Sequence, residues 1–179
     1  MNPPAIARSR LLICPVCQLP LEDPDQSGKK LQCGNNHSFD IARQGYIHLL
    51  PVQHKKSRSP GDNRAMVQSR QRFLSSGHYE PLANKLGCIL QEHLRDTTPL
   101  HLLDAGCGEG YYTRYLQAAL QQHWPDKTLT VCGIDISKDA IVAACRRSRQ
   151  ITWIVASLKQ PPVQPGSFHG LVSIFSPLP

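Results

Sequence analysis

The sequence contains no long apolar segment. No stretch approaches the roughly 18–20 consecutive apolar residues that a membrane-spanning helix needs, so we expect no membrane partner. The apolar run near the N-terminus, Leu11–Cys14, is too short for the core of a secretory signal peptide. With 40% hydrophobic and 18% charged residues, the composition is that of a globular chain, and we expect it in the cytoplasm.

The cysteines do not form an even set, and acidic residues are scarce in the first half. In a reducing compartment the 7 cysteines should be thiols, metal ligands or core residues, not disulfides. Cys88, Cys132 and Cys145 lie in apolar patterns and are expected in the core. Residues 1–80 hold 11 Lys/Arg against 6 Asp/Glu, which favours a polyanionic partner such as nucleic acid, although solubility alone explains it equally well.

Two short pairs of metal-binding residues stand near the N-terminus, in the pattern C-x2-C-x15-C-x3-H. Its members are Cys14, Cys17, Cys33 and His37. Each pair sits in a turn-rich stretch, which can place three thiolates and an imidazole around a tetrahedral Zn²⁺. All four protein positions would be filled, so the zinc is predicted to be structural. A segment of this size buries too little apolar surface to fold alone, and metal binding would supply the missing stability.

A basic stretch follows this module. Lys55, Lys56 and Arg58 are groups that neutralise phosphates, and we take them as candidate RNA-binding residues; a solvated linker is the alternative. Asp62 is a plausible N-cap for a helix over 63–75. Further on, an apolar face predicts a helix that packs on the following sheet; it comprises Leu82, Leu86, Ile89, Leu90 and Leu94.

The stretch "LLDAGCGEGYYT" indicates a strand, a tight turn and a helix. Asp104 closes the strand, and Gly106, Gly108 and Gly110 form G-x-G-x-G before a helix that starts at Tyr111. The turn directs backbone N–H groups and the helix N-terminus towards a ligand. A dinucleotide fingerprint would need glycine at Tyr111, so the spacing instead resembles motif I of S-adenosylmethionine (SAM)-dependent methyltransferases.

Two further strands complete the pattern. "LTVCGIDIS" predicts a strand that ends at Asp135, whose carboxylate could accept bonds from ribose hydroxyls, and Ser137 is placed to cap a helix over 138–149. "ITWIVAS" predicts a third strand, with Ser157 just beyond it, near an adenine. Alternating strands and helices predict a doubly wound parallel α/β sheet that binds its ligand at the carboxyl ends of the strands.

Together these stretches resemble one family, the ribosomal RNA large-subunit methyltransferase A type, which methylates N1 of a guanine in 23S rRNA. The resemblance is carried by "CPVC", "CGNNHSFDIARQGYIHLLPVQHKKSRSPGD", "FLSSGHYEPL" and "LLDAGCGEGYYT". It implies structural zinc in a module that helps to recognise RNA. It also implies SAM contacts from Tyr79, Gly108 and Glu109, and it matches Asp135 to the ribose-binding acid. The cofactor-binding residues that we expect are Tyr79, Asp104, Gly106, Gly108, Glu109, Asp135 and Ser157.

The family reaction requires that N1 of guanine lose its proton and lie in line with the reactive methyl group, with the base out of its stack. No catalytic residue is assigned; His54 and His78 are candidates by type only. The chain departs from the family pattern at His169, where an acid is usual, and it shows only four strands, near 100–104, 129–135, 151–156 and 170–175. We therefore expect a chain shortened at its C-terminus, with the fourth strand at an edge.

The expected organisation is a zinc-binding module over 10–50, a basic linker and helix over 51–78, and an incomplete Rossmann-like class I SAM-dependent methyltransferase domain over 79–179. The expected function is SAM-dependent methylation of guanine N1 in 23S rRNA. One alternative is that the shortened chain is inactive, as a non-catalytic, zinc-containing RNA-binding fragment. Another is a methyltransferase for another substrate. A homodimer is left open.

Overall fold

The structure, a computed structural model, contains two sheets, and it describes residues 11–54, 57 and 60–176. The first sheet has three short antiparallel strands in the order β1-β2-β3. β1 (Leu21–Glu22) and β2 (Lys30–Cys33) form a hairpin, as the turn-rich segment between them predicts, and β2 pairs with β3 (Ser38–Asp40). Cys33 ends β2, His37 precedes β3, and the first metal-binding pair precedes β1. The predicted zinc-binding module is therefore confirmed as a folded unit, a zinc ribbon.

The second sheet is parallel, in the order β4-β7-β6-β5-β8. Its strands are β4 (Tyr46–His48), β5 (Leu100–Ala105), β6 (Leu129–Asp135), β7 (Thr152–Val155) and β8 (Gly170–Val172). The predicted α/β class is confirmed, and β8 lies at one edge as expected. The predicted strand over 170–175 is too long, because Phe175 adopts a left-handed φ of 55°, which a strand does not allow.

The sheet has one strand more than the sequence predicts. β4 pairs in parallel with β7, and the isolated bridge between Leu12 and Val163 joins the N-terminal segment to the loop that follows β7. The domain limits 10–50, 51–78 and 79–179 stay a prediction, and β4 lies within the first of them although it belongs to the second sheet.

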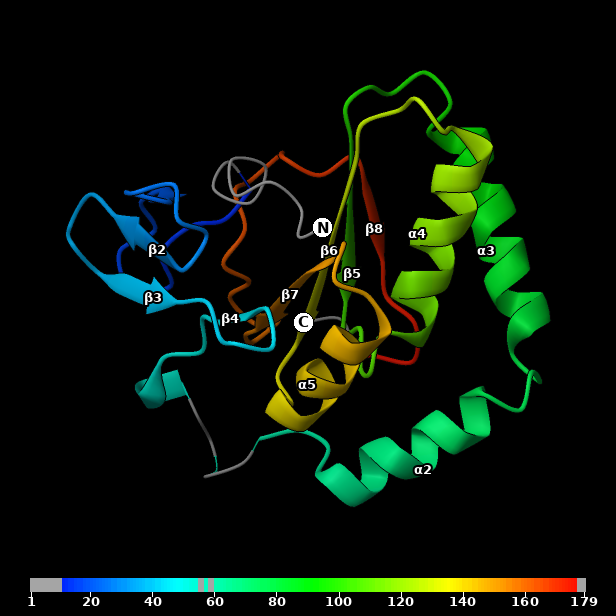
Figure 1. Ribbon diagram of the computed structural model, residues 1–179, viewed down its shortest axis with the longest axis horizontal. Helices are drawn as coiled ribbons and strands as arrows, with labels where there is room; N and C mark the ends of the chain where they lie inside the picture. Colours follow the sequence, from blue (N-terminus) through cyan, green and yellow to red (C-terminus); the bar gives the residue numbers. More distant parts are fainter. Residues whose placement is uncertain (1–10, 55–56, 58–59, 177–179) are drawn as a thin grey trace.

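Helices cover one face of the parallel sheet and the zinc ribbon covers the other (Figure 1). A 3-10 turn, η1 (Val52–His54), leads into the basic stretch. The helices are α2 (Arg64–Leu74), α3 (Glu80–His93), α4 (Tyr111–His123) and α5 (Lys138–Arg147). The sheet face that the helices cover forms one hydrophobic core with residues of α3, α4 and α5. The opposite face packs against Leu21 and Leu31 of the ribbon, so both sides of the central strands are buried. No helix in the described part of the chain combines the length and the apolar character needed to cross a bilayer.

Three local expectations are wrong: the N-cap of α2, part of the apolar face of α3, and the burial of Cys88. The N-cap of α2 is Asn63, whose Oδ1 accepts from Met66 N, because Asp62 instead pairs with Arg70. Of the expected apolar face of α3, Leu86, Leu90 and Leu94 pack in the helical core as predicted. The most deeply buried residues within α3 are instead the small Ala83 and Gly87, which let α4 approach closely.

The exposed residues on α3 complete these corrections. Leu82 and Ile89 are exposed, although we expected them on the buried face. Cys88 is exposed as well, whereas Cys132 and Cys145 are buried as expected. Ser137 caps α5, with its Oγ accepting from Ala140 N, as predicted.

Candidate functional site

The four metal-binding residues meet at one end of the antiparallel sheet. Their ligand atoms all lie within 4.8 Å of one another. His37 Nδ1 is 3.6 Å from Cys14 Sγ, 3.5 Å from Cys17 Sγ and 3.4 Å from Cys33 Sγ, and the last two sulfurs are 3.6 Å apart. Atoms bound to one zinc ion at about 2.3 Å for sulfur and about 2.0 Å for nitrogen lie roughly 3.5–3.8 Å apart at a tetrahedron's corners. The site therefore fits zinc in both donor type and spacing.

Tight turns hold the ligands in place. In the first pair, Cys14 N donates to Leu19 O at 2.8 Å and Gln18 N donates back to Cys14 O at 2.8 Å. In the second pair, Asn36 has a left-handed φ of 62° and its N donates to Cys33 O at 2.9 Å. Asparagine tolerates this conformation well. Three thiolates and one imidazole fill the tetrahedron, which leaves no position for a substrate, so the centre is structural.

The glycine turn lies at the carboxyl end of β5. Gly106 N and Cys107 N both donate to Ile134 O, at 2.8 and 3.0 Å, which ties the turn to β6. Gly110 is the N-cap of α4 with a φ of 81°, and a Cβ on it would lie 2.6 Å from the Trp153 ring. Only glycine fits there, because of both its conformation and its close contact. The turn thereby brings the start of α4 to the end of the sheet.

A pocket of about 220 Å³ opens beside this turn. Its wall is formed by α2, the α2–α3 connection, the end of β5 with the glycine turn, the start of α4 and the chain after β8. The lining residues are Arg70, Phe73, Leu74, Tyr79, Asp104, Gly106, Cys107, Gly108, Glu109, Tyr111, Tyr112, Ile174 and Phe175. Of the seven residues expected to bind the cofactor, Tyr79, Asp104, Gly106, Gly108 and Glu109 line this pocket, and their roles stay predictions.

Asp104 is a buried carboxyl on the pocket wall. Burial is the main cause that raises the pKa of Asp104 to about 7; the hydrogen bond from Thr113 opposes this shift, and the nearby Asp135 adds to it. Thr113 Oγ1 donates to Asp104 Oδ2 at 2.6 Å. A cation in the pocket would stabilise the ionised form, so Asp104 is suited to bind a ligand ammonium group.

Asp135 and Ser157 do not line the pocket, although Asp135 contacts Gly108, which does. Asp135 accepts from Gly108 N at 2.9 Å and from Ser137 N at 2.8 Å, so its carboxylate links the turn to the start of α5. Burial raises the pKa of Asp135, and the two backbone donors oppose that shift. Ser157 Oγ accepts from Lys159 N at 3.2 Å. The ribose and adenine roles assigned to these residues stay predictions.

Two polar atoms at the pocket lack a partner in the described part of the chain. Glu109 is 2% exposed; its Oε2 forms an ion pair with Arg147, and its Oε1 has no hydrogen bond. The Tyr112 hydroxyl is likewise unpaired, and burial raises the pKa of Tyr112 to about 12, so it stays a neutral donor. Buried polar groups usually have partners. These two atoms therefore fit a pocket that a polar ligand completes, as the predicted SAM would.

Arg70 is a functional candidate that the sequence reading missed. Its Nη1 lies 2.7 Å from Asp62 Oδ2 and beside the glycine turn, 3.6 Å from where a Cβ on Gly108 would be. Among the described residues that line the pocket, Arg70 is the sole cation. The chain before it is fixed by Ser137, whose Oγ donates to Asp62 O at 2.5 Å. The sequence showed only a charged face on this helix. It gave no sign that Arg70 would lie beside the glycine turn, which is far away in the sequence.

The remaining candidates do not converge on the pocket. Lys55, Lys56 and Arg58 lie outside the described residues, as does the side chain of His54. His78 is exposed, with its ring centroid 6.4 Å from that of Phe73. His169, at the site of the usual acid, accepts from His101 N through Nδ1 at 3.1 Å. It therefore stabilises the start of β5, at the opposite end of the strand from Asp104.

Two protein-family models match separate parts of the chain. Residues 12–58 match the zinc-ribbon family described as "RlmA, N-terminal". Residues 102–179 match a family described as "Methyltransferase domain". The first match contains all four metal-binding residues, and the second begins within β5 and contains the glycine turn and Asp135.

Individual relatives match most of the chain. A 23S rRNA (guanine(748)-N(1))-methyltransferase of Streptomyces fradiae is 31% identical over 169 residues, which cover 94% of this chain and 56% of that protein. YxjB of Bacillus subtilis strain 168, named as a candidate 23S rRNA (guanine-N(1)-)-methyltransferase, is 30% identical over 92% of this chain and 56% of its own length. The chain thus spans about half the length of the curated relatives that it matches.

A solved structure supports the fold alone. A candidate SAM-dependent methyltransferase from Methanococcus maripaludis aligns with a TM-score of 0.54 at 14% identity, over 68% of this chain and 55% of that protein.

We predict that Cys14→Ser loses zinc and unfolds more than the ribbon. A serine hydroxyl is a poor zinc ligand, and Cys14 belongs to the same buried cluster as Leu103 and Ile154 of the parallel sheet. Metal content by mass spectrometry and thermal unfolding measure the two effects. Cys88→Ser, at an exposed position, is the control and should keep both zinc and thermal stability. One zinc per chain in Cys14→Ser would contradict the ligand set.

We also predict that Asp104 makes stability fall as pH rises. The folded pKa of about 7 exceeds the ordinary value of 3.8, so between these values the folded chain keeps a proton that the unfolded chain has lost. The unfolding free energy should therefore fall from pH 4 to pH 7, by about 2–4 kcal/mol for this group. Asp104→Asn should show a correspondingly flatter curve in urea unfolding at each pH. Parallel curves for the two proteins would contradict the assignment.

Proposed function

Because this chain belongs to the RlmA family, we propose that it is a SAM-dependent methyltransferase that acts on N1 of a guanine in 23S rRNA. The observation that carries the proposal is the joint presence of the zinc ribbon and the glycine-turn pocket on one parallel sheet. The cytoplasm, where ribosomal RNA is found in bacteria, is the location that belongs to this proposal. The zinc ribbon and the basic stretch that follows it favour an RNA substrate over the small-molecule alternative.

The pocket has charges that complement those of the proposed cofactor. SAM supplies an activated methyl group, and its amino-acid part carries an ammonium and a carboxylate group. Asp104 would bind the ammonium group and Arg70 the carboxylate group, since these are an acid and the sole cation among the described lining residues. Asp135 would accept bonds from the ribose, Ser157 would lie near the adenine, and Tyr79 would pack against the ligand.

The remaining work of the protein is to place the guanine. Phe73 and Phe175 border the pocket, with 54% and 75% of their surfaces exposed, and the Tyr79 ring lies between them, 5.5 and 5.6 Å from their centroids. Exposed rings beside a cofactor pocket offer stacking partners for an extruded base. Stacking would hold the base in line with the methyl group.

The proposal predicts a modified guanine in RNA. A strain that lacks N1 methylation in 23S rRNA would express this chain, and reverse transcription across that RNA would be measured. A methyl group on N1 blocks Watson–Crick pairing, so one new stop should appear, and Asp104→Ala should abolish it. No stop with this chain, together with a stop from a full-length relative in the same strain, would favour the non-catalytic RNA-binding alternative.

A second prediction tests the proposed role of Arg70. Arg70→Gln should weaken binding of S-adenosylhomocysteine by about 10-fold or more, because a charge-assisted bond is lost. It should change the affinity for 5′-methylthioadenosine, which has no amino-acid part, by less than about twofold. Calorimetry with both ligands measures the difference, and Arg72→Gln on the same helix is the matched control. Equal losses for both ligands would mean that Arg70 only supports the pocket wall.

A further inference from the structure

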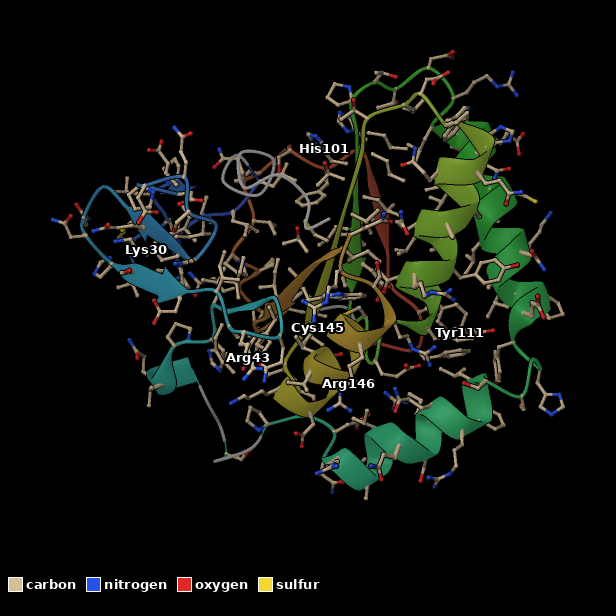
Figure 2. All side chains as sticks on the ribbon, in the orientation of Figure 1. Lys30, Arg43, His101, Tyr111, Cys145 and Arg146 are labelled. Carbon is tan, nitrogen blue, oxygen red and sulfur yellow. The ribbon has the colours of Figure 1, made fainter. Side chains whose placement is uncertain are left out.

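A second hollow, of about 470 Å³, lies away from the glycine turn between the β3–β4 loop and the end of α5. It is lined by Arg43, Gln44, Cys145, Arg146 and Arg149. Three guanidinium groups and an amide thus face one space, and none of these lining residues is acidic. Figure 2 shows Arg43 and Arg146 on the same side of the molecule, with Lys30 of the zinc ribbon further along that side.

The first wall of this hollow is a rigid turn. Gly45 N donates to Ala42 O at 2.7 Å, and Ala42 N donates to Tyr46 O at 2.8 Å. These bonds close a β-turn with Arg43 and Gln44 at its two central positions. The turn leads directly into β4, so its position is fixed by the pairing of β4 with β7. Arg43 is therefore presented from an ordered scaffold.

The second wall is the last turn of α5 and the residues that follow it. Cys145 is 4% exposed and packs in the same core cluster as Tyr46, with Ala42 against it. The two walls are thus joined below the surface by apolar contacts. Arg147, the neighbour of Arg146, points elsewhere and pairs with Glu109 at the cofactor pocket.

The arginines of the hollow form no ion pair within the described part of the chain. Across the described ranges 11–54 and 60–176, the ion pairs are Arg70–Asp62 and Arg147–Glu109, and neither includes a residue of the hollow. The helix dipole favours a cation at the end of α5, which accounts for Arg146. It does not account for Arg43, which comes from a different segment. Three cations around one space repel one another, and a bound anion removes that repulsion.

We propose that this hollow binds the phosphate backbone of the RNA substrate, which extends the RNA contact surface from the zinc ribbon to the end of α5. The inference rests on the proposed function, which supplies the polyanionic partner. Guanidinium groups bind phosphate oxygens in pairs of parallel hydrogen bonds, and the Gln44 amide adds a neutral donor. Such contacts position the RNA without reading its sequence, so recognition of the guanine remains with the cofactor pocket.

The test measures the salt dependence of RNA binding. The full chain would be titrated with unmodified, in vitro transcribed 23S rRNA fragments over a range of KCl concentrations. The test variant combines Arg43→Gln, Arg146→Gln and Arg149→Gln. Each lost phosphate contact should reduce the slope of log affinity against log salt by about 0.7–0.9, so the variant should lose about two units of slope and at least about 10-fold in affinity near 100 mM salt.

A matched variant controls for net charge. Lys85→Gln, Arg95→Gln and Arg114→Gln remove the same charge from exposed positions on and after α3 and on α4, none of which lines the hollow. This variant should keep its slope within about half a unit and its affinity within about threefold. Calorimetry with S-adenosylhomocysteine should show unchanged affinity in both triple variants, which verifies that they are folded.

The outcomes separate the two proposals. Equal losses in the two triple variants, or no loss in the test variant, would refute the hollow as a phosphate site while leaving the proposed function intact. A wild-type chain that binds S-adenosylhomocysteine but no RNA would instead refute the RNA partner, and the hollow with it. Strong displacement of RNA by about 10 mM inorganic phosphate at constant ionic strength would assign the hollow to a small anion and overturn the inference.

Discussion

The structure depends on burial of both faces of its parallel sheet. Neighbouring residues on each central strand point in opposite directions, so Leu102 packs under the helices while Leu103 packs under the zinc ribbon. Parallel strands of this kind are stable only when both faces are covered. In the described part of the chain, α3, α4 and α5 share the core of one face, and the zinc ribbon supplies the cover of the other. A zinc ion bound in the ribbon would therefore stabilise the sheet as well as the ribbon.

This double burial also determines the geometry of the cofactor pocket. Asp104 is the last residue but one of β5 and Asp135 is the last residue of β6, so the parallel pairing of the two strands places both carboxylates at the same edge. The glycine turn is tied to Ile134 at the end of β6, and Ser137 caps α5 while it holds Asp62 beside the turn. Asp62, which precedes α2, thus holds Arg70 at the pocket wall. Residues that the sequence assigns to RNA binding lie only a few positions before Asp62.

The sequence was informative wherever one local pattern determines the structure. The metal ligands follow from the spacing of two short pairs, and the glycine turn follows from three glycines between a strand and a helix. The expectations that were wrong or missing depend on distant partners. β4 is three residues long and shows no periodicity, so its pairing with β7 could not be predicted. Helix α3 buries Ala83 and Gly87 because α4 approaches closely, and the Asp62–Arg70 pair exists only after α2 has docked. The roles assigned to Tyr79, Asp135 and Ser157 stay predictions, because no ligand contact bears on them.

The pairing of β4 with β7 has a consequence for how the chain folds as it is made. β4 ends at His48, whereas its partner begins only at Thr152, so about 100 residues separate the two strands. A ribosome that adds about 5–20 residues per second needs about 5–20 s to cover that interval. During this time the ribbon has left the ribosome with its apolar inner face still uncovered. Early capture of zinc would hold the ribbon in a compact form until the sheet arrives to cover it.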